Sequence, residues 1–90
     1  MKFSIRIRDK VTSITLRENV VSMWLVLSDK SGSDDLYREV LRFVYNCLDD
    51  WDREDGKGLS DFVLTRMICE MLEEGDFLEY KRVLGYFRGN

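Results

Sequence analysis

In the segment TSITLR, residues 12–17, the hydroxyl groups of Ser13 and Thr15 and the guanidinium of Arg17 alternate with apolar side chains. Successive side chains of a strand point to opposite faces, so Ser13, Thr15 and Arg17 share one face and Ile14 and Leu16 the other. Hydroxyl and guanidinium groups hydrogen-bond to base edges in the major groove of DNA, which admits a two-stranded ribbon. We therefore take Ser13, Thr15 and Arg17 as candidate base-reading residues.

One strand does not make a ribbon by itself. If residues 12–17 pair with their twofold copy in a second subunit, the strand gains backbone hydrogen bonds and the reading surface doubles. Lys2 and Lys10 belong to the basic N-terminal segment and are candidate phosphate contacts, which strengthen binding to every sequence alike. This interpretation predicts a homodimer bound to double-stranded DNA.

Other chemistry finds little support in the composition. The chain has no histidine, which is the usual general base near neutral pH and the commonest metal ligand. Cys47 and Cys69 fall within apolar helical periodicity and not in a CxxC spacing, so we expect two small buried hydrophobes. A carboxylate-rich stretch lacks the ligand spacing of an EF-hand and favours a solvated helix end: Asp49, Asp50, Asp52, Glu54 and Asp55. We expect no catalysis, no metal and no cofactor.

Length and composition indicate one folded domain, residues 1–90, because 44% of the residues are apolar and 34% charged. No apolar run approaches the ~20 residues that span a bilayer, and residues 1–10 alternate where a signal peptide would be continuously apolar. We therefore expect a protein of the reducing cytoplasm that has no membrane partner.

Charge is distributed unevenly along the chain, whose net charge is -3. Residues 1–17 carry five basic residues and one acidic residue, whereas residues 18–61 carry five basic and eleven acidic residues. A basic head suits nucleic acid, and an acidic body suits a protein partner. Taken alone, the charge is explained better by a basic strand face that is simply solvated.

The elements that would position these residues follow from hydrophobic periodicity. Residues 2–17 alternate at a period of two and predict two short strands, for which a hairpin is permitted, although its turn lacks Asn-Gly. Helical spacing predicts helices over 18–29, 34–53, 60–73 and 76–87. Ser33 and Ser60 are the expected N-caps, and Gly75 is expected to end the third helix. The fold class is therefore α+β, an N-terminal ribbon followed by about four helices.

The segments TSITLRENVV and GLSDFVL resemble the strand with its helix start, and the entry to the second helix, of the ribbon-helix-helix family of DNA-binding proteins. The resemblance covers residues 10–29 and 57–73, and residues 33–54 would be a helical insertion between them. It implies base reading by Ser13, Thr15 and Arg17, and phosphate binding by amides around Leu59, Ser60 and Asp61. It also implies a dimer core made of Ile14, Leu16, Trp24, Val63 and Met67.

Two hypotheses follow. The first is a dimeric, sequence-specific transcription regulator that inserts a shared ribbon into the major groove. The second is a small α+β protein–protein interaction module in which residues 2–17 form an internal hairpin and the acidic helices bind a protein. Pairing of residues 12–17 across a twofold axis would favour the first hypothesis, and pairing within one chain would favour the second.

Overall fold

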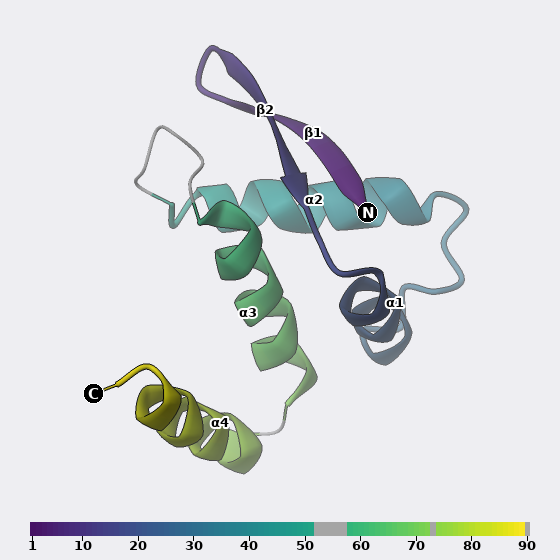
Figure 1. Ribbon diagram of the computed structural model, residues 1–90. Coiled ribbons are helices and arrows are strands. Elements are labelled where there is room, and N and C mark those ends of the chain that lie inside the picture. The colour runs from purple at the N-terminus through teal and green to yellow at the C-terminus, as the bar shows by residue number, and fades with distance from the viewer. Residues whose placement is uncertain (52–57, 73, 90) are drawn as a thin grey trace.

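The computed structural model describes residues 1–51, 58–72 and 74–89, and the chain forms a two-stranded antiparallel ribbon followed by four helices (Figure 1). This arrangement confirms the expected α+β fold. The elements, in chain order, are β1 (Lys2–Ile7), β2 (Lys10–Thr15), α1 (Glu18–Leu27), α2 (Leu36–Leu48), α3 (Leu59–Met71) and α4 (Glu74–Phe87).

The ribbon is a hairpin of one chain. β1 pairs with β2 in a register that runs from Lys2 opposite Thr15, at the base, to Ile7 opposite Lys10, at the tip. Arg8 begins the two-residue turn in the left-handed conformation, with φ of 56°, which tight hairpin turns require and which Asn or Gly would adopt with less strain. Of the two pairings considered for residues 12–17, the structure therefore has the one that favours the interaction module.

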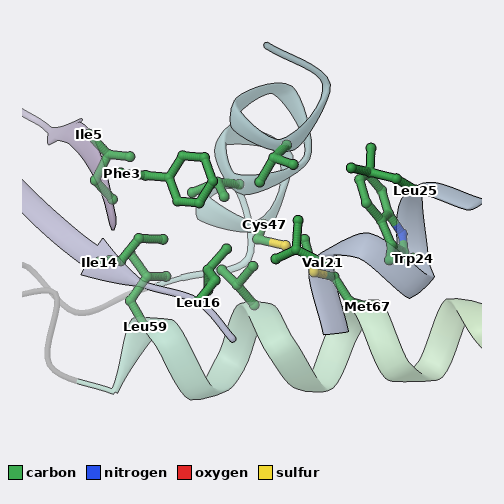
Figure 2. Close-up of a cluster of buried hydrophobic side chains, with 13 residues drawn as sticks. Phe3, Ile5, Ile14, Leu16, Val21, Trp24, Leu25, Cys47, Leu59 and Met67 are labelled. Carbon is green, nitrogen blue, oxygen red and sulfur yellow. The ribbon is translucent and has the colours of Figure 1, made fainter. Parts of the chain in front are cut away.

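The inner face of the ribbon packs on the helices and forms part of a single apolar core (Figure 2). Ile14 is 4% exposed and Leu16 is fully buried. The resemblance assigned both side chains to a dimer core, but they are buried within one chain, in the core that the ribbon forms with the helices. The core consists of Phe3, Ile5, Ile14, Leu16, Val21, Trp24, Leu25, Val40, Val44, Cys47, Leu59, Val63 and Met67.

Helix packing brings together elements that are distant in sequence. α1 and α3 pack against each other although α2 lies between them in the chain. Trp24, Val63 and Met67, which the resemblance assigned to a dimer core, are buried inside this one chain. No helix within the described ranges is both long and apolar enough to cross a bilayer.

Three expected helix boundaries are wrong. The N-cap of α2 is Asp35, not Ser33, because the Asp35 carboxylate accepts a hydrogen bond of 3.0 Å from the Arg38 amide. The N-cap of α3 is Gly58 in the left-handed conformation, and Ser60 lies inside the first turn.

Gly75 lies in the first turn of α4 and does not end α3. α3 ends at Met71, where Leu72 turns to an extended conformation. The second helix is also shorter than the apolar periodicity indicated, because the periodicity continues to Trp51, which packs on the core from outside the helix.

Both cysteines are free thiols in the described chain, Cys47 buried and Cys69 half-buried. Burial raises the pKa of the Cys47 thiol from its ordinary value of 9.0 to about 11, because a thiolate would lose its hydration there. At a pH between these two pKa values the Cys47 thiol is therefore mostly protonated in the folded state and mostly ionised in the unfolded state.

This shift predicts an alkaline loss of stability. Since the unfolded thiol ionises first, the free energy of unfolding should be unaffected by this group below pH 9 and fall by up to about 2–3 kcal/mol between pH 9 and 11. Urea unfolding of Cys47→Ala and of wild type across pH 7–11 measures this effect. The free energy of unfolding of wild type should fall more steeply with pH than that of the variant. Parallel curves for the two proteins would contradict it, and Cys69→Ala serves as the control for the less buried thiol.

Candidate nucleic-acid interface

The ribbon presents a polar outer face on the side opposite the core. Three cross-strand pairs form this face, and all six side chains are exposed. The outer face, as the term is used below, consists of Lys2, Ser4 and Arg6 of β1 and Thr15, Ser13 and Val11 of β2, paired in that order. Two cations, three hydroxyl groups and one apolar side chain thus project from a surface that bears no carboxylate.

The alternation of residue types creates this surface. Phe3, Ile5 and Ile14 turn inward to the core, so their neighbours along each strand must turn outward. The Arg6 amide donates a hydrogen bond of 3.2 Å to the Tyr45 hydroxyl of α2, and therefore points away from β2. The outer-face residues are thus the non-hydrogen-bonded pairs of the ladder, in which opposing side chains lie closest together.

Hydroxyl groups from two helices hold the edges of the ribbon. Tyr45 accepts from the edge of β1, and Ser60 Oγ of α3 accepts a hydrogen bond of 3.3 Å from the Thr15 amide on the edge of β2. At the base, the Met1 amino group donates to the Leu16 carbonyl oxygen at 2.8 Å, and the Leu16 amide donates to the Met1 oxygen at 2.8 Å. These contacts fix the direction in which the outer face points.

The structure brings together two of the three predicted base readers. Ser13 and Thr15 lie on the outer face, two residues apart on β2. Arg17 lies beyond the end of the strand, at the N-cap of α1, where it lines a cleft between α1, α3 and α4. The cause is that the strand ends at Thr15 and the chain turns into the helix.

The predicted phosphate contacts are dispersed. Lys2 and Lys10 are exposed at opposite ends of the hairpin, the base and the tip. The Leu59 side chain is buried in the core, so only its backbone amide remains as a candidate, and the Ser60 hydroxyl is already bonded to Thr15. Asp61 is exposed, and its carboxylate pairs with Arg88 at 3.3 Å.

Sequence reasoning about residues 12–17 missed the contribution of β1. Ser4 and Arg6, and also Val11 at the start of β2, belong to the outer face although none was singled out as a site residue. The signal was present in KFSIRIR, where polar and apolar residues alternate as they do in TSITLR. Only the register shows that the two polar rows meet on one face.

No group of three or more potential metal ligands is found within residues 1–51, 58–72 and 74–89. Three members of the carboxylate stretch considered above, Asp52, Glu54 and Asp55, lie outside the described residues. Comparison of the chain with models of protein families, with curated proteins and with solved structures yields no match. The resemblance to ribbon-helix-helix proteins therefore stays a prediction.

Proposed function

We propose that this protein binds double-stranded DNA by placing the outer face of its hairpin in the major groove. The observation that carries the proposal is the outer face itself, a two-stranded ribbon with exposed cations and hydroxyl groups, supplied by one chain. A ribbon of this kind fits the width of the groove. The inward-facing apolar residues of the ribbon pack in the core, and the outer face is exposed to a ligand.

Each side chain of the outer face has a partner of suitable chemistry in duplex DNA. Arg6 can form two hydrogen bonds with guanine, and Val11 can contact a thymine methyl group. The hydroxyl groups of Ser4, Ser13 and Thr15 can donate hydrogen bonds to base edges or accept hydrogen bonds from them. Strands of six residues are about 20 Å long and follow roughly six base pairs. Lys2, on the outer face at the base, would then contact a phosphate, whereas Lys10 stands opposite Ile7 at the tip, on the other side of the ribbon, and is the weaker candidate.

The mechanism differs from that of a ribbon shared between subunits. Because β1 and β2 come from the same chain, one protomer supplies both strands of the ribbon. Regulation of transcription would follow from occupation of a site on DNA, and remains part of the proposal.

Replacement of Arg6 by alanine tests base reading. We expect Arg6→Ala to weaken binding to a selected duplex by about 1–3 kcal/mol, while binding to a scrambled duplex changes much less. Lys2→Ala should instead weaken binding to both duplexes and reduce the salt dependence. Fluorescence anisotropy titrations at two salt concentrations measure these effects, using a duplex recovered from random-sequence selection.

Arg38→Ala is the matched control, because it removes the same charge from an exposed position on α2. It should leave both affinities within about twofold of wild type, since long-range attraction between exposed charges is largely screened. Equal losses of DNA affinity in Arg6→Ala and Arg38→Ala would show that binding depends only on net charge, and would contradict recognition in the groove.

The protein–protein interaction module is the second candidate, and pairing of residues 12–17 within one chain favours it. In this alternative the acidic helices bind a protein and the basic ribbon plays no part. Absence of salt-dependent affinity for any duplex recovered from selection would exclude DNA as the ligand and leave the module as the function to be tested.

A further inference from the structure

The cleft between α1, α3 and α4 has an apolar wall that three helices build together. Val20 of α1, Leu64 and Ile68 of α3, and Tyr80 and Leu84 of α4 line it, and all five side chains are half-buried. The cleft has a volume of about 210 Å³. Since an apolar cavity of about 150 Å³ holds a benzene molecule, a single aromatic ring with a short substituent fits in this volume.

Arg17 adds a cation to the cleft that the protein itself does not neutralise. Within residues 1–51, 58–72 and 74–89, its guanidinium forms no ion pair and no hydrogen bond. Arg88 also lines the cleft, and it pairs with Asp61 at 3.3 Å. The described lining thus carries two arginines and one aspartate, a surplus of one positive charge. A guanidinium binds a carboxylate through two parallel hydrogen bonds, so the cleft offers a carboxylate site beside an apolar wall.

A molecule in this cleft would also connect α4 to the other helices. No described residue of α4 belongs to the buried core or to the side chains packed against it. An isolated helix of 14 residues is marginal in water, so α4 gains from any further packing. A ligand that fills the cleft contacts α1, α3 and α4 at once and should hold α4 in place.

We propose that the cleft between α1, α3 and α4 binds a small aromatic carboxylate. Arg17 binds the carboxylate group, and the apolar wall covers the ring. The single surplus positive charge matches a monoanion, whereas the carboxylate of Asp61 would repel a second negative charge. The proposal is independent of DNA binding, because no residue of the ribbon's outer face lines the cleft.

Titration of the full chain with phenylacetate, in the absence of DNA, tests the proposal. Phenylacetamide is the matched probe, because it has the same ring and no charge. We expect wild type to bind phenylacetate with a Kd of about 0.1–1 mM, and phenylacetamide at least about tenfold more weakly. Two-dimensional NMR should place the largest amide shifts in residues 64–68 and 80–84. Absence of saturable binding at about 10 mM phenylacetate, or equal affinity for the two probes, overturns the proposal.

Two substitutions separate the charge from the apolar wall. Arg17→Gln should weaken binding of phenylacetate at least about tenfold and leave that of phenylacetamide within about twofold of wild type. Leu84→Ala should weaken binding of both probes alike, by about three- to tenfold, because it removes apolar contact area.

Arg38→Gln is the matched control, since Arg38 is exposed on α2 and does not line the cleft. It should leave both affinities unchanged. Far-UV circular dichroism shows whether each variant retains its helices. A folded Arg17→Gln that binds phenylacetate as tightly as wild type overturns the proposal.

Amide hydrogen exchange tests the contact with α4. At a phenylacetate concentration of about ten times Kd, exchange of the α4 amides should slow about tenfold, because only a docked α4 completes the site. The same concentration of phenylacetate should slow exchange much less in Arg17→Gln. Unchanged exchange of α4 in wild type at saturation would place the ligand outside the cleft and overturn the proposal.

Discussion

Trp24→Ala should lower the free energy of unfolding by about 3–5 kcal/mol, the usual cost of truncating a large buried aromatic side chain. Trp24 is 1% exposed and belongs to the side of α1 that faces α3. Its ring lies 4.7 Å from that of Phe43 on α2, and its indole nitrogen donates a hydrogen bond of 2.6 Å to Glu70 on α3. The substitution therefore removes a contact that joins three helices at once.

Two further substitutions separate the contributions of this side chain. Trp24→Phe retains most of the apolar ring and removes the donor, whereas Glu70→Gln retains an acceptor and removes the charge. We expect Trp24→Phe to cost less than half as much as Trp24→Ala, and Glu70→Gln to cost about 1 kcal/mol or less. Urea unfolding followed by circular dichroism measures all three. A cost below ~1 kcal/mol for Trp24→Ala would place the ring outside the core.

Phe3→Ala should destabilise the fold by a similar amount, about 3–5 kcal/mol. Phe3 is fully buried under the ribbon, and its ring stacks on that of Tyr37 of α2 with centroids 4.7 Å apart. The side chain fastens β1 to the helices, and β1 is paired edge to edge with β2. Loss of this ring should therefore weaken the docking of the whole ribbon.

Ser4→Ala is the matched control for the ribbon, because Ser4 is the next residue of the same strand and points outward. We expect it to change the free energy of unfolding by less than about 0.5 kcal/mol. Amide hydrogen exchange shows where the damage falls, and in Phe3→Ala the ribbon amides should lose protection before those of α3. Equal effects of the two substitutions would show that the ribbon is not docked on the core as described.

Several features of the fold were predictable from the sequence because they follow from local rules. Alternation of residue types in residues 2–17 identified two strands, and spacing of three and four residues located four helices. The same alternation assigned Ser13 and Thr15 to a polar face. Helix ends were less predictable, because several neighbouring residues can cap a helix and tertiary contacts select among them. Ser60, for example, bonds to Thr15 and does not cap α3.

The sequence by itself determined the strands, the helices and the polar character of one strand face, since each depends on residues near one another in the chain. Tertiary structure alone decided that β1 is the partner of β2, that Ile14 and Leu16 are buried within one chain, and that Arg6 joins the outer face while Arg17 leaves it. An unpaired strand satisfies its backbone groups equally well with a neighbouring segment or with a second copy. The helices of this chain present an apolar surface on which the inner side of both strands packs, and this surface favours pairing within one chain over pairing with a second copy. No local sequence pattern encodes the fit between the strands and the helices.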